Sequence, residues 1–381
     1  MRIGTKTALR RRRWLSAAVL TLALGALTAC SSSEGTTGGG GTTDKVDTSG
    51  IGKAQELYDG FLARPTQIPN TAPVGAAVPT GKKVTFISCG TPTCNLEADI
   101  IKTATDKLGW SFSVIASDGT PEKIKAAWQQ VLREKPDGVI YSATPRAGFE
   151  PELQQAASMG IHVTACCTTD PPGDGLDFVI GQPTQSTGVG QAMAAWVITT
   201  GEGKANSVYV DLSAFPILGE LYKGYSGVMD DLCAACKYDR LDIPITALGK
   251  DVTERIVGYL RSHPDTKFVA LSVDGALGTG LPAALKAAGL NDIKVVGEGP
   301  DTTTLQYISS GQQQATVMFP FWEEMYAQVD ALARLFAGVP LEEKTTVPTW
   351  IITKDNLPTD QEIFPVVADT QEQYFKLWGV A

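Results

Sequence analysis

The sequence predicts an α/β protein with two doubly wound domains, each built on a mostly parallel sheet. In the stretch 137–170, two short apolar runs, 138–141 and 161–166, flank a segment whose apolar residues recur at helical spacing. Strands joined by so short a crossover lie parallel, with a right-handed connection. The same alternation recurs before and after this stretch, which is typical of doubly wound sheets. Ligands bind such sheets at the loops that leave the carboxyl ends of the strands.

The first half of the body alternates strands and helices in order. A short helix over 54–62 and a proline-rich leader to residue 78 precede it. Apolar runs predict strands at 83–88, 112–116, 138–141, 161–166 and 178–180. Apolar residues at helical spacing predict helices across 96–108, 124–132 and 149–159. Thr120 followed by Pro121 forms the start of the second of these helices.

The second half of the body repeats the pattern. Strands are predicted at 207–210, 268–272, 293–297 and 314–318, and one more starts at residue 241. Helices are predicted at 218–231, 252–260 and 281–288. No run of Gly, Ser or Pro separates the two halves, which indicates tight crossovers and not a flexible linker. The body is long enough for two domains of ordinary size.

The N-terminus has the pattern of an export signal. Arg10–Arg13 precede an apolar run, Leu15–Ala29, that is shorter than the about 20 residues needed to span a bilayer. The run ends in Leu27-Thr28-Ala29-Cys30, which resembles the lipobox of bacterial lipoproteins. This resemblance implies cleavage before Cys30, lipidation (palmitate) of its thiol, and a location at the outer face of the cytoplasmic membrane, in the cell envelope. The arginines leave Sec and twin-arginine export both open.

A flexible tether follows the lipidation site. Ser31–Thr43 consists almost entirely of Ser, Thr and Gly, a composition that cannot build a core. Such a tether holds a soluble domain near a membrane without constraining its orientation.

The charge balance argues against a nucleic-acid partner. The whole chain has a net charge of −9, and six basic residues but no acidic residue precede Cys30. Cleavage there would leave 26 basic and 41 acidic residues, a net charge of −15. No cluster of Lys and Arg remains that could follow a phosphate backbone. An acidic surface chiefly favours solubility.

Six cysteines follow Cys30, which is consistent with an oxidising compartment. A disulfide between Cys89 and Cys94 is expected first, because the loop between them is short and rich in turn-forming residues. A structural bridge between Cys233 and Cys236 at a helix end is expected next. Cys166 and Cys167 are either free thiols or a vicinal disulfide, and the sequence does not decide between the two.

The order and spacing of four stretches resemble the type I periplasmic binding proteins, the ribose/galactose-like substrate-binding subunits of ABC importers. These stretches are KPDGVIYSATP, AASMGIHV, IKVVGEGPDTTTLQYISSGQQQATV and TVPTWIITKDNL, and together they cover residues of about 82–356. The resemblance implies two doubly wound Rossmann-like domains joined by three hinge crossings, with a small-molecule ligand enclosed between them. It also implies a permease partner, a monomer without a cofactor, and no enzymatic activity.

The resemblance also suggests the domain limits. Hinges are expected near 182–186, 318–321 and 346–348. The predicted parts are a signal peptide at 1–29, a tether at 30–49, a helical and Pro-rich leader at 50–81, an N-terminal domain at 82–184 plus 320–346, and a C-terminal domain at 185–319 plus 347–381. Within the last part, Phe364–Ala381 is an extra C-terminal segment.

The chain departs from the sugar-binding pattern of this family at the site itself. Sugar binders carry an Asp-Arg pair, an Asn-Asp pair, a further acid and a hinge-side Gln at four places. This chain has Cys167–Thr168, Val273–Asp274, Gly299 and Phe319 there. Because few charged groups remain to satisfy many hydroxyl groups, we expect a ligand that is sugar-like or less polar, with fewer hydroxyls than a pentose or hexose.

Ligand contacts are expected from the strand-end loops and the hinge. The predicted residues are Cys89, Gly90, Thr91, Asn95, Ser142, Ala143, Cys167, Thr168, Gln182, Ser186, Phe215, Asp274, Glu298, Phe319 and Trp322. Three of them have a structural alternative. Trp322 could instead pack into the core, and Asp274 and Glu298 could instead cap the helices that follow them.

Catalytic and metal-binding patterns are absent from the sequence. It contains no H-E-x-x-H, G-x-S-x-G or G-x-x-x-x-G-K-[ST] string, and its thiols lack the spacing of a zinc site. The only histidines, His162 and His263, are interpreted as structural. Three alternative functions are a receptor for a membrane sensor, a secreted enzyme, and a transcription regulator with the same core. The lipobox excludes the regulator in practice, and neither a catalytic residue nor a metal is predicted.

Overall fold

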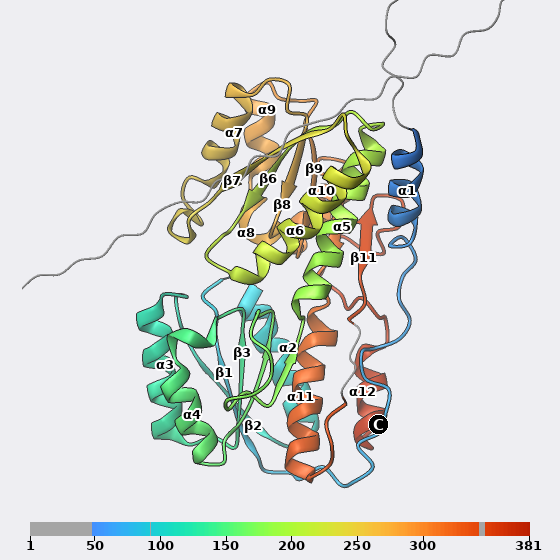
Figure 1. Ribbon diagram of the computed structural model, residues 1–381. Helices are drawn as coiled ribbons and strands as arrows, with labels where there is room; N and C mark the ends of the chain where they lie inside the picture. Colours follow the sequence, from blue (N-terminus) through green and yellow to red (C-terminus); the bar gives the residue numbers. More distant parts are fainter. Residues whose placement is uncertain (1–47, 92, 343–346) are drawn as a thin grey trace, which may run out of the picture. The chain divides into compact units, whose positions relative to one another are not determined.

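The computed structural model describes residues 48–91, 93–342 and 347–381. The predicted signal peptide, Cys30 and the tether up to residue 47 lie outside these residues, as does part of the predicted hinge at 346–348. The described chain forms two α/β lobes, each built around one sheet (Figure 1). Within the described ranges, no helix is long and apolar enough to cross a membrane.

The first lobe contains a five-stranded parallel sheet in the order β2-β1-β3-β4-β5. Helices α2 (Thr93–Lys107) and α11 (Phe321–Ala337) pack on one face. Helices α3 (Pro121–Glu134) and α4 (Glu150–Ser158) pack on the other face. The strands are β1 (Lys83–Ile87), β2 (Ser111–Ile115), β3 (Gly138–Ser142), β4 (His162–Cys166) and β5 (Phe178–Ile180), and a 3₁₀ turn covers Arg146–Gly148.

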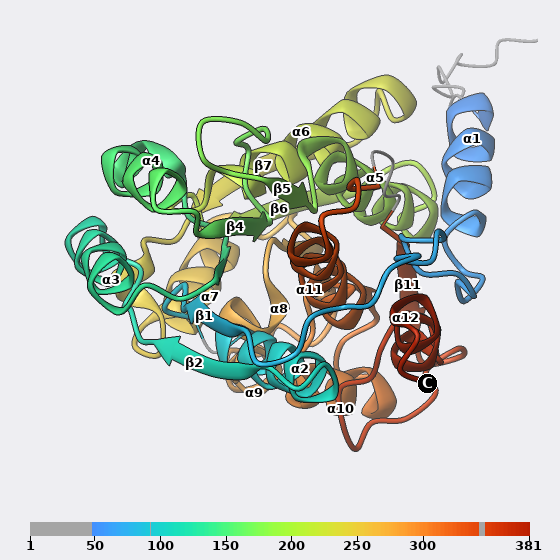
Figure 2. The same ribbon diagram turned by 90° about the horizontal axis from the view of Figure 1, so that it is seen from below.

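The second lobe contains a six-stranded sheet in the order β11-β10-β9-β8-β6-β7, in which only β11 is antiparallel. Its strands are β6 (Asn206–Asp211), β7 (Lys237–Asp242), β8 (Phe268–Leu271), β9 (Lys294–Glu298), β10 (Ala315–Met318) and β11 (Trp350–Thr353). Its helices are α1 (Thr48–Asp59), α5 (Pro183–Thr200), α6 (Pro216–Leu232), α7 (Val252–Ser262), α8 (Asp274–Leu277), α9 (Leu281–Ala287) and α10 (Thr302–Ser310), with a 3₁₀ turn at Ile245–Ala247. Helices α1, α5 and α6 share one core with the sheet, and α7 and α9 share another (Figure 2).

The predicted strands are all present, which confirms the predicted fold class. Most of their ends differ from the predicted ends by one residue. The exception is β7, which starts at Lys237 and not at Leu241. This edge strand is largely exposed, and only Tyr238 and Leu241 in it are partly buried. The short apolar run that starts at Leu241 therefore indicated only the end of the strand. Strand β3, by contrast, is buried along its whole length.

Two long helices occupy positions where only hinges were predicted. The chain leaves β5 and enters α5 at Pro183, and it leaves β10 and enters α11 at Phe321. A third connection runs from α11 to β11, so the three expected crossings are present (Figure 1). Helix α5 was missed because it is apolar on nearly all sides and therefore lacks an amphipathic pattern.

The helices α5 and α6 approach each other closely through two glycines. A Cβ atom on Gly190 of α5 would overlap the backbone oxygen of Leu221, and one on Gly224 of α6 would overlap the backbone oxygen of Thr187. Each glycine thus lies against the backbone of the opposite helix. The lack of a side chain at both positions is what allows this contact.

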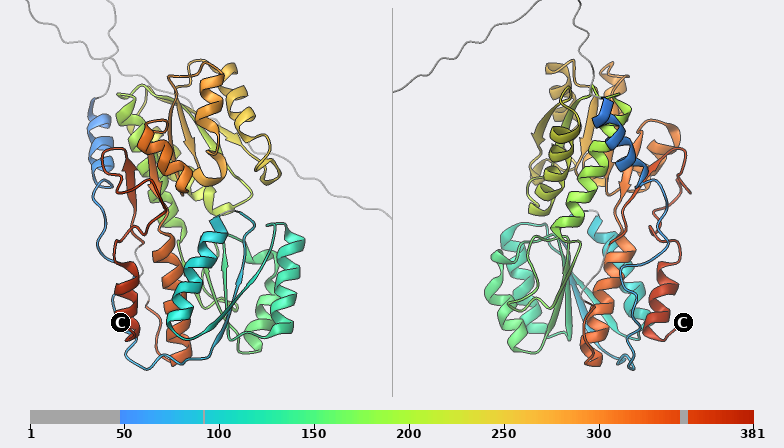
Figure 3. Two further views of the ribbon diagram at one scale, coloured as in Figure 1. Left: turned by 180° about the vertical axis from the view of Figure 1, so that it is seen from behind. Right: turned by 45° about the vertical axis from the view of Figure 1, so that its right-hand side comes forward.

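The helix of the C-terminal segment packs on the first lobe. Helix α12 (Thr370–Trp378) lies beside α11 (Figure 3). The rings of Trp378 and Tyr326 are stacked 5.7 Å apart. The Trp378 Nε1–H donates to Asp330 Oδ1 over 2.9 Å. Strand β11 pairs in the second sheet, whereas α12 lies on α11 because a buried polar partner and an aromatic stack hold it there.

The leader also contacts both lobes. Helix α1 packs on α5, and the backbone oxygen of Phe61 accepts from Ile351 N of β11 over 2.9 Å. Farther along, Val74 N donates to Leu377 O over 2.9 Å, and Ile68 lies in the core of the first lobe. The leader and the tail therefore add two further links between the lobes to the three crossings (Figure 3).

Three pairs of cysteines have their sulfur atoms at bonding distance. These pairs are Cys89–Cys94, Cys166–Cys167 and Cys233–Cys236. The Cα atoms of the first pair lie 5.9 Å apart and those of the third pair 5.3 Å apart, within the usual range for a disulfide.

The glycine contact between α5 and α6 leads to a test of stability. We expect Gly224→Ala to lower the free energy of unfolding by about 1–3 kcal/mol or more, because the added methyl group must displace backbone. Gly227→Ala in the same helix is the matched control, since a Cβ atom there meets no atom within 4 Å. We expect this control to raise stability by roughly 0.5–1 kcal/mol through helix propensity. Urea denaturation measures both, and equal effects of the two substitutions would contradict the close contact.

Candidate functional site

A cavity opens where the strands of both sheets end. The volume of the cavity is about 100 Å³. A volume of about 10–15 Å³ on the same scale is enough for one water molecule. The cavity can therefore hold a small organic molecule. It is lined by Cys89, Thr91, Thr93, Glu97, Ser142, Ala143, Cys167, Gly181, Gln185, Ser186, Val189, Leu212, Phe215, Ile217, Leu218, Leu221, Val273, Glu298, Gly299, Met318, Phe319, Pro320, Phe321 and Glu324.

Most of the predicted strand-end residues line this cavity. Parallel strands end at the same edge of a sheet, so the loops after them meet there, as the sequence predicted. The predicted residues that line the cavity are Cys89, Thr91, Ser142, Ala143, Cys167, Ser186, Phe215, Glu298 and Phe319.

The other predicted residues lie outside the cavity lining. Asn95 is exposed on α2, and Gln182 is exposed just before α5. Trp322 packs against the core of the first lobe, as its structural alternative predicted, while the preceding Phe321 lines the cavity. The buried Thr168 donates from Oγ1 to Asp170 Oδ2 over 2.9 Å and so holds its own turn. Gly90 lies against the backbone of Asp118, where no Cβ atom fits.

Asp274 is turned away from the cavity into the second lobe. Its fully buried carboxylate accepts two contacts of 3.0 Å from Gln313 Nε2 and one of 2.5 Å from Thr316 Oγ1. Burial raises its pKa to about 7, against the lowering effect of these hydrogen bonds. The absence of a side chain at Gly297 of β9 leaves space for the Asp274 carboxylate, because a Cβ atom there would overlap it. Asp274 therefore holds β8 to β10, and its predicted capping of a helix is not seen either.

The predictions missed one wall of the cavity, which is apolar. This wall comes from the starts of α5, α6 and α11 and from strand ends of the second lobe. Its members are Val189, Leu212, Ile217, Leu218, Leu221, Val273, Met318, Pro320 and Phe321. Apolar side chains at such positions look like core in a sequence, so no sequence signal distinguished them.

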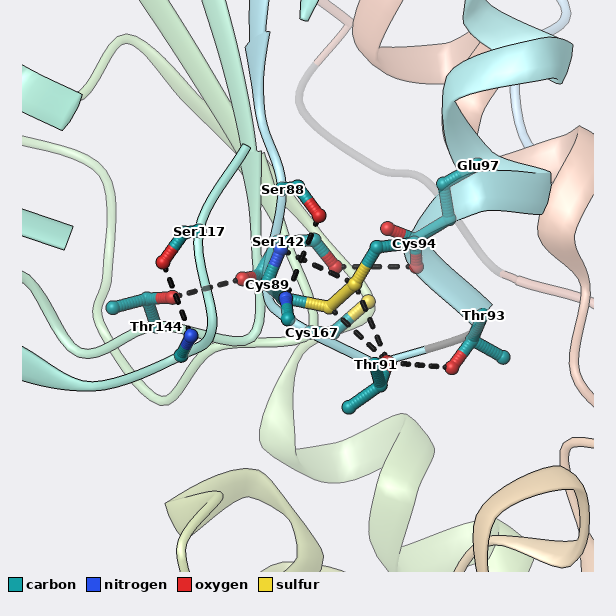
Figure 4. The surroundings of a disulfide bond; sticks show 12 residues. Ser88, Cys89, Thr91, Thr93, Cys94, Glu97, Ser117, Ser142, Thr144 and Cys167 are labelled. Atoms are coloured by element: carbon teal, nitrogen blue, oxygen red, sulfur yellow. Dashed lines mark hydrogen bonds between the residues drawn. A yellow bond between two sulfur atoms is a disulfide. The ribbon is translucent and has the colours of Figure 1, made fainter. Parts of the chain in front are cut away.

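Two glutamates in the cavity lining were also missed. Glu97 on α2 is 4% exposed, and its Oε1 accepts from Ser142 Oγ over 3.2 Å (Figure 4). Glu324 on α11 is fully buried, and its Oε1 accepts from Gln185 Nε2 over 3.0 Å. Gly181 allows this position, because a Cβ atom there would lie 2.8 Å from both Glu324 oxygens. With Glu298, three carboxyl groups face the cavity.

Burial changes the protonation of these three groups. It raises the pKa of Glu97 to about 8, against the lowering effect of the Ser142 hydrogen bond. It also raises the pKa of Glu324 to about 8, where the charges of Glu97 and Glu323 act in the same direction and the Gln185 hydrogen bond opposes them. The pKa of Glu298 is raised well above its usual value by burial and by the charges of Asp274 and Glu324. Glu97 and Glu324 are therefore mainly protonated at neutral pH when the cavity is empty, and the same effect favours the protonated form of Glu298.

Two loops of the first lobe have unusual backbone at the cavity. Ala143 has a φ of 59° and Cys167 a φ of 61°, in the left-handed region that few residues other than glycine adopt. Such conformations are frequent at ligand sites. Figure 4 shows Cys167 close to Ser142 and to the Cys89–Cys94 pair.

The sulfur of Cys167 has two close neighbours. It lies 3.2 Å from Glu324 Oε2 and at bonding distance from the sulfur of Cys166. Only a thiol can donate a hydrogen bond to the carboxyl group, so the contact with Glu324 is a hydrogen bond only in the reduced form. A carboxyl oxygen of Glu97 lies within 4.8 Å of the sulfur atoms of Cys166 and Cys167. Cys167, whether reduced or oxidised, therefore lies between Glu324 and Glu97.

Solved structures with the same fold are numerous, although their sequences are distant. An ABC sugar transporter subunit from Rhodobacter sphaeroides is 18% identical with a TM-score of 0.64, over 72% of this chain and 99% of that one. A 5-methylthioribose transporter solute-binding protein from Thermotoga lettingae is 17% identical with a TM-score of 0.66, over 81% and 95%. A carbohydrate transporter from Acidothermus cellulolyticus, in complex with myo-inositol, is 20% identical with a TM-score of 0.62, over 78% and 99%.

Comparison with protein-family models shows the family to which this chain belongs. A search of curated protein sequences finds no match to this chain. The family model of the periplasmic binding protein domain matches residues 91–339, which is more than half of the chain. The match confirms the resemblance inferred from the four stretches. The chain therefore belongs to the periplasmic binding protein family, whose members bind substrates and are not enzymes.

Proposed function

We propose that this chain is an extracytoplasmic solute-binding protein that closes on a small molecule and delivers it to the permease of an ABC transporter. The observation that carries the proposal is the cavity between the lobes, which the strand-end loops of both sheets line. A ligand there contacts both lobes at once and so favours the closed arrangement over an open one. The similar transporter proteins with bound 5-methylthioribose and myo-inositol support the same role.

The ligand is a small molecule with an apolar part. Phe215, Phe319 and Phe321 present rings to the cavity, and the rings of Phe319 and Phe321 lie 4.6 Å apart. Burial of a ligand's apolar surface against this wall contributes about 25 cal/mol per Å². The neutral polar groups of the lining, among them Ser142, Ser186 and Gln185, orient the ligand.

The protein acts as a monomer on a lipid anchor. Lipidation of Cys30, followed by the Ser/Thr/Gly-rich tether, would hold the two lobes close to the membrane that contains the permease. In that oxidising location Cys89–Cys94 and Cys233–Cys236 are disulfides. The distances between their Cα atoms support both bridges.

We expect the protein purified from its own membranes to carry a small molecule, which native mass spectrometry would detect. Phe319→Ala should weaken rebinding of that molecule at least tenfold, because a buried Phe side chain contributes about 1.5–3 kcal/mol. Phe364→Ala, which removes a ring outside the cavity lining, is the control and should leave the affinity unchanged. A protein that carries no molecule and binds none would contradict the receptor function.

We expect Cys30→Ala to release the protein from membranes, since the thiol that carries the lipid is lost. Fractionation of cells into soluble and membrane parts measures this. Retention of the substituted protein in the membrane fraction would refute the lipobox interpretation.

Peptide mapping without reduction should recover Cys89 linked to Cys94 and Cys233 linked to Cys236. Each loop is short, so loss of either bridge should lower stability only modestly, by about 2–3 kcal/mol at most. A link between Cys89 and Cys233 would be incompatible with their positions in different lobes.

A further inference from the structure

The cavity contains acidic groups without a basic partner. Glu97, Glu298 and Glu324 line it from three different elements, α2, β9 and α11. Among the described lining residues there is no Lys, Arg or His. Several carboxyl groups lining one cavity repel one another when ionised, so they are either protonated or matched by a positive charge that enters with a ligand.

Other buried carboxyl groups of this protein have partners inside the fold. Asp211 accepts from the guanidinium of Arg240. Asp330 accepts from Arg334 Nε over 2.7 Å and from Trp378. The carboxyl groups of the cavity differ from Asp211 and Asp330 in lacking an internal cation, and from the buried Asp274 and Glu323, which have only uncharged donors, in lining a space that a ligand can enter.

Polar atoms of the lining also lack hydrogen-bond partners. Glu97 Oε2 and Gln185 Oε1 are buried with no partner among the described residues. Glu298 is 6% exposed, and in the described part of the chain no donor hydrogen-bonds its carboxyl group. Buried acceptors without donors destabilise a protein. Because Glu97 and Gln185 both belong to the cavity lining, a bound molecule with several N–H groups would satisfy these acceptors once the two side chains turn toward it.

We propose that the ligand of this receptor is an organic amine, with its ammonium group between Glu97, Glu298 and Glu324 and its apolar part against Phe215, Phe319 and Phe321. This inference rests on the proposed function and names its substrate class. An ammonium group has three donors and no acceptor, which matches a lining whose unpartnered atoms are acceptors. Aromatic rings favour a nearby cation as well.

The raised pKa values predict how the affinity for an amine changes with pH. Glu97 and Glu324, each with a pKa of about 8, hold protons at neutral pH in the empty cavity. An ammonium ion stabilises the ionised carboxylates, so binding lowers their pKa and releases protons. Affinity must then rise as the pH rises from 6 to 8, while an alkylamine with a pKa of about 10 keeps its charge. The other acids that face these groups, Glu323 and Asp274, oppose ionisation and therefore strengthen this dependence.

Isothermal titration of the full-length mature protein, freed of bound molecules, tests the proposal with matched probes. The probes are 2-phenylethylamine against its neutral counterpart 2-phenylethanol, and glucosamine against glucose. We expect each amine to bind at least tenfold more tightly than its neutral counterpart, and 2-phenylethylamine to bind at least tenfold more tightly at pH 8 than at pH 6. Titration in two buffers of different ionisation heat should show net release of protons.

Glu298→Gln tests the same site without removing an internal hydrogen bond. This substitution keeps the shape of the side chain and should weaken amine binding at least tenfold, with no effect on the neutral probes. Glu152→Gln is the control, because Glu152 is a buried carboxyl group on α4 outside the cavity lining. Thermal unfolding of both variants verifies that they are folded.

The outcomes separate the amine inference from the receptor function. Binding of glucose or 2-phenylethanol as tightly as the amines, without proton release, overturns the inference and leaves the receptor function intact. Unchanged amine affinity in Glu298→Gln also overturns it. If no probe binds, the inference is overturned, and the mass of the co-purifying molecule decides whether the receptor function stands.

Discussion

In both sheets the parallel strands end at the same edge, and the loops after β1, β3, β4, β6, β8, β9 and β10 all begin there. This direction of the strands is the constraint on which the cavity depends, because it brings together side chains that lie more than 200 residues apart, such as Thr91 and Phe319. Inner strands such as β3 and β9 are buried on both faces, so their register and direction are strongly specified. The loops are then free to carry polar residues and unusual backbone, as at Ala143 and Cys167.

The helix α11 connects the cavity to the segments that link the lobes. Its first turns supply Phe321 and Glu324 to the cavity. About two turns farther on, Asp330 accepts from Arg334, from Trp378 of the tail, and from Asn70 of the leader over 3.2 Å. The tail and the leader therefore pack on the same helix that enters the site, and they fix its position within the first lobe. The leader and the tail also reach the second lobe, at Ile351 and Val366.

The buried acids of the protein fall into two groups that differ in what surrounds them. Where an acid contributes to the fold, as at Asp330 or Asp274, donors from neighbouring elements approach it. Where an acid faces the cavity, donors are few, and burial has raised the pKa of Glu97 and of Glu324 to about 8. A protein tolerates such groups when they are neutral or when a cation matches them. The same burial thus stabilises the empty cavity in its uncharged form and prepares it for a charged partner.

The sequence alone determined the fold, the family and most of the strand-end contacts. Strands buried on both faces and amphipathic helices are visible as periods of apolar residues, so the order of elements and the loops after β1, β3, β4 and β6 could be placed. It could not find α5, whose residues are apolar on nearly every side, nor tell that α12 packs on α11. Glu97 and Glu324 lie in helices, and the sequence of a helix does not tell whether a glutamate faces solvent or a cavity. Nothing in the sequence indicated that the Asp274 side chain turns inward over Gly297. Burial depends on which elements pack around a side chain. That is a property of the tertiary structure and not of the local sequence.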